Sequence, residues 1–233
     1  MPSFDIVKEI RPDNTFRVNS VVNNFSLDIA HAHEHFAGNI DIEDKEWNVG
    51  LIVGGSGTGK STIAKECFGD YYIKGYEYKA QAIIDDMPAN VSVKDIEKTF
   101  TSVGFASPPS WLKPFDVLSN GEKMRVDLAR SILEGKEVIV FDEFTSVVNR
   151  EVAKTSSYAI AKAVRKQGKK FVAVACHRDI IDWLEPDWIY DTDEKRFFIV
   201  RESTTALMSN LKYIGLTTEL KSKCGKCLES III

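Results

Sequence analysis

The chain has 233 residues, of which 44% are hydrophobic and 27% are charged, and its formal net charge is −4. This length and composition are those of one large globular domain or two small ones. The slightly acidic balance excludes a protein that coats nucleic acid or acidic lipid by bulk electrostatics. The first residues lack the pattern of a secretory signal and no apolar run has membrane-spanning length, so a cytoplasmic protein is predicted.

The first half of the chain predicts strands, a Gly-rich turn and then a change of pattern. Residues 14–29 alternate apolar and polar side chains, which predicts one or two strands. Residues 40–53 predict a strand pair that leads into GGSGTGKST, and residues 69–75 predict a short strand and turn. Between residues 85 and 134 the pattern favours helices, the first of them with Ser92 as its N-cap and Asp95 three residues later. A small helical insertion in a larger core is expected.

The second half of the chain alternates helices with buried strands. Helices are predicted over residues 122–134 and 149–166, and continuously apolar strands over residues 137–143 and 170–176. Residues 187–200 fit a final strand pair. This order predicts an α/β fold in which a mixed sheet is flanked by helices.

The stretch GGSGTGKST at residues 54–62 has the spacing of a phosphate-binding P-loop. Glycines let the backbone wrap closely around an anion, and the N-terminus of the following helix adds its positive end. Lys60 is predicted to reach the β- and γ-phosphates, and the Ser61 hydroxyl to bind Mg²⁺. The remaining residues of the cradle are Gly54, Gly55, Ser56, Gly57, Thr58, Gly59 and Thr62.

Two of the buried strands end in groups that could act on a bound nucleotide. Ligands of such sheets lie at the carboxyl ends of the strands. Asp142 is predicted to hold Mg²⁺, and Glu143 to deprotonate an attacking water. His177 follows the other strand and would face the same ligand. For all three residues the alternative is a structural role at the end of a strand.

Histidine and cysteine residues give weaker signals. The cluster HAHEH at residues 31–35 resembles a metal site, but its spacing favours a solvated turn. Cys67 and Cys176 lie in apolar surroundings and are predicted to be core thiols. Cys224 and Cys227 form a lone CxxC, which predicts a polar tail or half of a metal site.

The order of the motifs resembles that of ATP-binding cassette (ABC) ATPases. The P-loop is followed by Gln81, by LSNGE at residues 118–122, which is similar to the family signature LSGGQ, by Glu143 and by His177. The resemblance implies a P-loop NTPase of ABC type over residues 1–205, with a helical subdomain at about residues 85–134 and a tail over residues 206–233. It also implies ATP and Mg²⁺ as cofactors and a head-to-tail dimer with two shared ATP sites.

Several site residues come from this resemblance alone. Ser119, Asn120 and Gly121 would contact the γ-phosphate bound to the other subunit. Gln81 would sense Mg²⁺ and the attacking water, Glu143 would be the catalytic base, and His177 would hold the γ-phosphate. Phe25 is similar to the aromatic residue that stacks on adenine, with Phe16 or a core role as alternatives.

Three uses of such an ATPase are consistent with the sequence. The favoured prediction is a soluble ATPase that acts on a macromolecular partner, a nucleic acid or a protein. A basic cluster at residues 162–170 is compatible with a nucleic acid, although a solvated helix face also explains it. The first alternative is the ATPase subunit of a transporter whose membrane subunits are separate chains. The second is an ATP-gated binding module that does not hydrolyse ATP.

Overall fold

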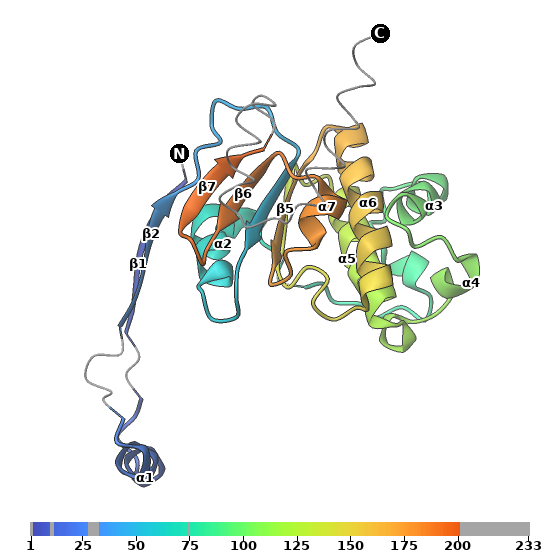
Figure 1. The fold of residues 1–233 in the computed structure, drawn as a ribbon. Coiled ribbons are helices and arrows are strands. Elements are labelled where there is room, and N and C mark those ends of the chain that lie inside the picture. Colours follow the sequence, from blue (N-terminus) through green and yellow to red (C-terminus); the bar gives the residue numbers. More distant parts are fainter. Residues whose placement is uncertain (1, 10–11, 28–32, 74, 201–233) are drawn as a thin grey trace.

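A five-stranded mixed sheet is the centre of the protein (Figure 1). The computed structural model describes residues 2–9, 12–27, 33–73 and 75–200. The strand order is β4-β5-β3-β6-β7, with β7 antiparallel to β6 and the other neighbours parallel. The strands are β3 (Val49–Val53), β4 (Val138–Phe141), β5 (Lys170–Ala175), β6 (Trp188–Asp191) and β7 (Arg196–Ile199). The predicted mixed α/β sheet is confirmed.

Helices cover both faces of the sheet because its central strands alternate between two cores. Ile52 of β3 belongs to the core that contains Ile63 and Phe68 of α2 (Lys60–Phe68). Its neighbours Leu51 and Val53 point to the opposite face and belong to a second core. Helices α5 (Asn120–Leu133), α6 (Arg150–Gln167) and α7 (Ile180–Leu184) contribute to that second core.

The middle of the chain forms a group of helices beside the sheet, on the right in Figure 1. It contains α3 (Val93–Ser102), α4 (Pro108–Trp111), α5 and the 3-10 turns η2 (Ile83–Asp86) and η3 (Phe115–Val117). Ser92 caps α3 by accepting the Asp95 N–H, as the sequence predicts. Ser119 and Glu122 form a reciprocal capping box at the start of α5. These hydrogen bonds define the start of α5 directly after Ser119, the serine of the LSNGE stretch.

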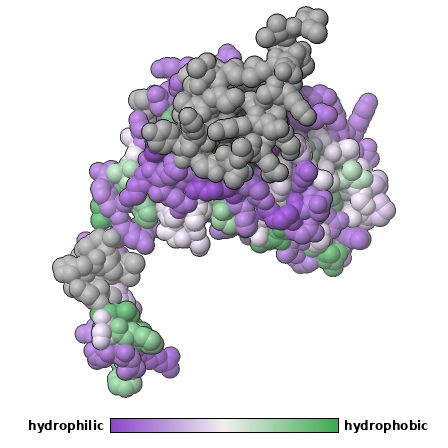
Figure 2. All heavy atoms as spheres, viewed as in Figure 1, coloured by the Kyte–Doolittle hydropathy of each residue, from purple (hydrophilic) through white to green (hydrophobic). Residues whose placement is uncertain are grey.

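The N-terminal segment forms an arm that projects from the body in Figure 1. Strands β1 (Ser3–Glu9) and β2 (His33–Asn39) pair antiparallel, and α1 (Phe16–Phe25) lies beyond them. No residue of α1 is buried, and Figure 2 shows hydrophobic side chains on its surface. The arm therefore consists of a two-stranded ribbon and an exposed helix beyond it.

The predicted strands over residues 14–29 are wrong, because residues 16–25 form a helix. Val18, Val21, Val22 and Phe25 recur at helical spacing, and Thr15 accepts the Val18 N–H as the N-cap. In a short stretch, the apolar residues can match both the two-residue period of a strand and the 3.6-residue period of a helix. The cap at Thr15 favours the helical period.

Two further expectations from the first half of the chain are corrected. Only Val49–Val53 of the predicted strand pair over residues 40–53 is a strand, while residues 40–48 form an irregular connection. Residues 69–75 begin with the 3-10 turn η1 (Gly69–Tyr71) and make a single bridge between Tyr72 and Val140. Within the described residues, no helix is both long and apolar enough to cross a membrane.

Strand β3 carries a glycine where the Trp188 ring lies against its backbone. A Cβ atom added to Gly50 would lie 2.1 Å from Cζ2 of Trp188. Trp188 is itself fully buried, and it stacks on Phe68 at 6.2 Å between ring centroids. A methyl group at position 50 would therefore have to displace a buried aromatic ring.

We predict that Gly50→Ala lowers the free energy of unfolding by about 2–3 kcal/mol, because overpacking a tight core costs this much. Gly69→Ala is the control, since φ is −52° there and no atom lies within 4 Å of the added Cβ. Urea denaturation of both variants measures the difference. Equal stability of the two variants would contradict the packing described for Trp188.

A carboxyl group on α5 has an unusual protonation equilibrium. Burial raises the pKa of Asp127 from 3.8 to about 6, against the lowering effects of the Tyr78 hydrogen bond and of Arg130. The native state therefore holds this proton more tightly than the unfolded chain does. The resulting destabilisation is absent below about pH 4, grows as the pH rises from 4 to 6, and is fully present above pH 6.

We predict that Asp127→Asn stabilises the protein by about 1–2 kcal/mol at pH 8, because the amide carries no charge to bury. The Tyr78 hydroxyl, 2.7 Å from Asp127 Oδ1, can still donate to the amide oxygen. Urea unfolding of both proteins at pH 4.5 and pH 8 checks this. The gain should shrink at the lower pH, and a gain that is constant with pH would refute the pKa assignment.

Candidate active site

The P-loop connects β3 to α2, as the sequence predicts. Gly59 has a φ of +85° at the N-cap of α2, in the left-handed region that glycine tolerates best. A Cβ atom there would lie 2.4 Å from the Phe36 ring. Position 59 therefore requires glycine for two reasons, its backbone conformation and the aromatic ring of the N-terminal arm.

The P-loop lines a cavity of about 360 Å³. Lys60 is only 9% exposed, and its Nζ donates a hydrogen bond to the carbonyl oxygen of Gly55. The positive end of α2 and the Lys60 ammonium give the cavity the charge that attracts an anion. Its lining consists of Lys8, Glu34, Ser56, Gly57, Gly59, Lys60, Ser61, Thr62, Glu143 and Cys176.

The turn between β6 and β7 stabilises the first half of the P-loop through hydrogen bonds. The Asp193 carboxylate accepts the Gly55 N–H at 3.0 Å, and this bond and Arg178 lower the pKa of Asp193. Thr192 and Thr58 are joined through their hydroxyls at 2.5 Å. Sequence analysis missed this support, because no motif links residues that are 134 or more positions apart.

The candidate catalytic residues follow strands that end at one edge of the sheet, as expected because these strands are parallel. Strand β5 lies between β3 and β4, with Val53 opposite Ala175 and Phe141 opposite Ala173. Glu143, which follows β4, lines the P-loop cavity. His177 follows β5 and is exposed, while its neighbour Cys176 lines the cavity. Cys176 was predicted to be a core thiol, but it is only partly buried and also borders the cavity.

Asp142 is held by two hydrogen bonds. Its Oδ1 accepts the Glu143 N–H at 2.9 Å, and its Oδ2 accepts the Tyr72 hydroxyl proton. Burial and the Asp142 carboxylate raise the pKa of Tyr72 above its usual value, which strengthens the preference of the phenol for the protonated, donating form. Sequence analysis did not identify Tyr72, because it lies outside every motif.

The two predicted oxygen donors suit Mg²⁺ by their chemistry: the Ser61 hydroxyl lines the cavity, while the Asp142 carboxylate, which is not among the lining residues, follows β4 next to Glu143. Magnesium in nucleotide sites uses one or two protein oxygens and takes its other ligands from phosphate and water. Among the described residues there is no group of three or more His, Cys, Asp or Glu side chains that could hold a metal. The donor set therefore suits a metal that arrives with a nucleotide.

Several predicted site residues lie outside the cavity. Gln81 is exposed and does not line it. Ser119 and Asn120 are exposed at the start of α5, while Gly121 is buried against Val148 and Val152. None of the three signature residues lines the P-loop cavity of its own chain.

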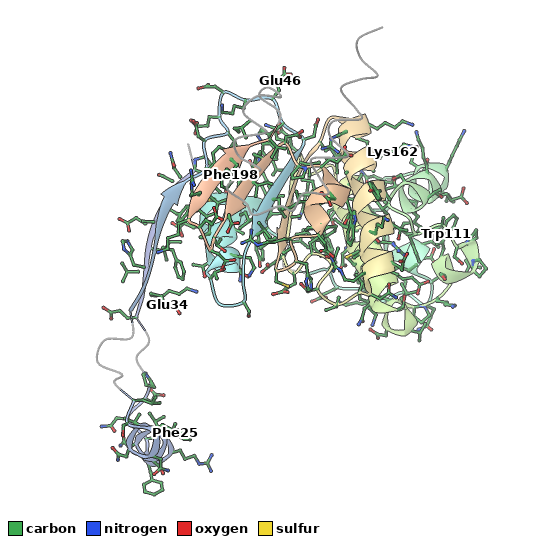
Figure 3. The ribbon with its side chains drawn as sticks, in the orientation of Figure 1. Phe25, Glu34, Glu46, Trp111, Lys162 and Phe198 are labelled. Carbon is green, nitrogen blue, oxygen red and sulfur yellow. The ribbon has the colours of Figure 1, made fainter. Side chains whose placement is uncertain are left out.

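Phe25 is not brought to the P-loop. It lies on α1 at the far end of the arm, where it is 72% exposed (Figure 3). The alternative, Phe16, begins the same helix and is 87% exposed. Phe36 of β2 is the aromatic residue of the arm that contacts the loop, at Gly59. The positions of Phe25 and Phe16 therefore give no support to the predicted adenine stack.

No described histidine or cysteine of the weaker metal signals lines the P-loop cavity except Cys176, although Glu34 of the HAHEH cluster does. His35 binds Asp5 at 2.6 Å on the exposed surface of the hairpin, and residues 31 and 32 lie outside the described part of the chain. Cys67 lies on α2 and packs against the core, where burial raises the pKa of its thiol to about 12. Cys224 and Cys227 lie outside the described residues.

Comparison with known proteins identifies the family. The sequence profile of the "ATPase family associated with various cellular activities (AAA)" matches residues 50–198, which is more than half of the chain. The chain belongs to the AAA family of ATPases. The match begins in β3, before the P-loop, and ends in β7, so this ATPase domain contains the whole edge described above.

Relatives of known type are ATP-binding cassettes. A putative ABC transporter ATP-binding protein of Clostridium perfringens is 26% identical over 80% of this chain, which spans 39% of that protein's length. The fold resembles a dimeric ATP-binding cassette bound to ADP and phosphate, with a TM-score of 0.57, 14% identity, and coverage of 73% of this chain and 94% of the other.

A second cassette structure is also similar. This C. perfringens protein is part of the ABC transporter complex cbiONQ, and its TM-score is 0.55 at 16% identity, over 84% of this chain and 91% of the other. The ABC resemblance of this AAA ATPase is thereby confirmed, and so is its P-loop NTPase fold.

We predict that Tyr72→Phe raises the Mg²⁺ concentration needed for half-maximal ATPase activity by about tenfold. Loss of a hydrogen bond that orients a metal-binding carboxylate typically weakens metal binding by this amount. The measurement is a Mg²⁺ titration of ATP hydrolysis by the purified protein. Tyr71→Phe, at the exposed neighbouring position, is the matched control. An unchanged Mg²⁺ requirement in Tyr72→Phe would show that this hydrogen bond does not tune metal binding at Asp142.

Proposed function

We propose that this ATPase hydrolyses ATP as an ABC cassette, in a head-to-tail dimer with two shared sites. The observation that carries the proposal is that Glu143 and Lys60 line the same cavity although 83 positions separate them. A phosphate-binding ammonium and a carboxylate that can act as a base thus face one ligand. This combination suits the hydrolysis of a nucleoside triphosphate.

The residues of the cavity divide the work of hydrolysis. The N–H groups of the P-loop and the Lys60 ammonium bind the phosphates and withdraw negative charge from the bond that breaks. Glu143 accepts a proton from the attacking water. Ser61 and Asp142 would hold Mg²⁺, whose charge would neutralise that of the phosphates. His177 would contact the γ-phosphate from the end of β5, beside Cys176.

The signature residues support a second subunit at each site. Ser119 and Asn120 are exposed at the start of α5, whose capping box leaves the helix N-terminus well ordered. A helix of 14 residues presents a positive end that suits the γ-phosphate of another subunit. Asn149, which stands where ABC proteins usually carry aspartate, caps α6 by accepting the Val152 N–H. Asn149 therefore has a structural role as the N-cap of α6.

Phe36 replaces Phe25 as our candidate for the adenine stack. It is half-buried on β2, and it contacts Gly59, the last residue of the loop before Lys60. Gln81 stays a candidate sensor of Mg²⁺, but only if its exposed loop moves toward the cavity when ATP binds.

The relatives favour separate membrane subunits as the partner. This choice reverses the preference drawn from the sequence, in which a nucleic acid or a soluble protein came first. The relative from C. perfringens is named as a transporter's ATP-binding protein, and a cassette of similar fold is part of a transporter complex. An ATPase subunit of this kind works where ATP is available, on the cytoplasmic side.

We predict that Glu143→Gln lowers kcat for ATP by a factor of about 10²–10⁴, because the amide cannot accept the proton from water. Binding of ATP and ATP-dependent dimerisation should persist, since the phosphate cradle is intact. Turnover assays and size-exclusion chromatography with ATP measure the two effects. Glu137→Gln, at an exposed acid before β4, is the control. Normal turnover in Glu143→Gln would rule out this base.

The partner can be tested with the same ATPase assay. Activity of the purified chain is compared alone, with DNA, with RNA and with liposomes that carry co-expressed membrane subunits. Stimulation by the subunits alone is expected. Stimulation by nucleic acid would restore the soluble role and overturn the transporter assignment.

A further inference from the structure

The β1–β2 hairpin has an inner and an outer face. Side chains alternate along a strand, and the register places Phe4 opposite Gly38, Ile6 opposite Phe36 and Lys8 opposite Glu34. Phe4 is buried, and Ile6 and Phe36 pack against the same core as α2. The intervening side chains of β1 and β2, such as Val7 and His35, are exposed. One face of the ribbon therefore lies on the body.

Lys8 and Glu34 continue this inner face toward α1, where the apolar residues end. Both side chains line the P-loop cavity, and Lys8 Nζ donates a hydrogen bond to Thr62 Oγ1 (Glu34 is labelled in Figure 3). A polar pair at two inner positions is not needed to hold the hairpin, because Phe4, Ile6 and Phe36 already do so. The pair faces the cavity instead.

The position of the pair within the cavity defines the part of a nucleotide that it would meet. Glu143 and Cys176 come from β4 and β5, where the γ-phosphate is hydrolysed in the proposed function. The P-loop supplies most of the remaining lining, and the hairpin adds Lys8 and Glu34, with Lys8 bonded to Thr62 in the first turn of α2. Because Glu143 and Cys176 take the γ-phosphate in the proposed function, the hairpin is assigned to the nucleoside end of the phosphate chain.

We propose that Lys8 binds the α-phosphate of a ribonucleoside di- or triphosphate, and that Glu34 accepts hydrogen bonds from its ribose hydroxyls. This inference rests on the proposed function. An ammonium has three N–H donors, of which Thr62 takes one and leaves two for phosphate oxygens. A carboxylate accepts only, so it suits hydroxyl donors and not phosphate. The Lys8 charge, directly opposite on the ribbon, offsets repulsion between Glu34 and the phosphates.

The α-phosphate assignment is tested by calorimetric binding of ADP and ATP to the full chain. Lys8→Met should weaken both ligands equally, by about tenfold, because both carry the α-phosphate and one charge-assisted hydrogen bond has this effect. It should also make ADP binding less sensitive to salt. Lys8→Arg should retain most of the affinity. Lys94→Met, on the exposed surface of α3, is the matched control and should bind as the wild type does.

Other outcomes separate this subsite from the proposed function. Loss of ATP affinity alone in Lys8→Met would place Lys8 at the γ-phosphate and overturn the assignment. Unchanged affinity for both nucleotides would overturn it as well, while loss of binding in Lys60→Ala would still support the P-loop function. If the wild-type chain binds neither nucleotide, the proposed function itself fails.

The ribose assignment is tested with ADP and 2′-deoxy-ADP. The wild type should prefer ADP by about five- to tenfold, which is the value of one hydrogen bond to a charged group at an exposed site. In Glu34→Ala this ratio should fall toward one. A ratio that Glu34→Ala leaves unchanged, or a wild type without preference, would overturn the role of Glu34. Glu46→Ala, at an exposed acid of the β2–β3 connection, is the control.

Discussion

Parallel pairing of β3 with β5, and of β5 with β4, is the constraint on which the active site depends. Parallel strands end at the same edge of a sheet, so three segments that are far apart in the sequence deliver their last residues to one place. The P-loop, Glu143 and Cys176 with His177 meet there because Val53 is level with Ala175 and Phe141 with Ala173. A shift of this register by one residue would turn alternate side chains to the opposite face.

Support for the phosphate cradle comes from parts of the chain that carry no nucleotide motif. Asp193 and Thr192 hold the first half of the loop from the β6–β7 turn. Phe36 contacts Gly59 from the arm, and Tyr72 holds Asp142. A loop that must wrap an anion needs external bonds, because its glycines give little rigidity of their own. In this AAA ATPase the β6–β7 turn, the N-terminal arm and Tyr72, which follows η1, supply these contacts.

The sequence predicted most of the sheet and its helices because several levels of local information agreed there. Around α5, for example, apolar periodicity, the Ser119 cap and Glu122 all indicate one helix, and the structure has it. The strand prediction for residues 14–29 used periodicity alone, and it is wrong because the cap at Thr15 favours a helix. The aromatic candidate Phe25, which came from the family resemblance, lies at the far end of the arm (Figure 3). The placement of Phe36 depends on a hairpin whose strands pair across 24 or more positions.

The sequence by itself determined that this protein has a P-loop, because the spacing of glycines, Lys60 and Ser61 is a local requirement of phosphate binding, and its resemblance to ABC ATPases came from the order of the later motifs. It also determined that Asp142, Glu143 and His177 end buried strands, since continuous apolar runs stop at these residues. Only the tertiary structure decided what surrounds the cradle: Lys8, Glu34 and Phe36 on one side, Asp193 on another, and Tyr72 at Asp142. These contacts join residues far apart in the chain, and their chemistry becomes visible only when strand pairing fixes which side chains share a face.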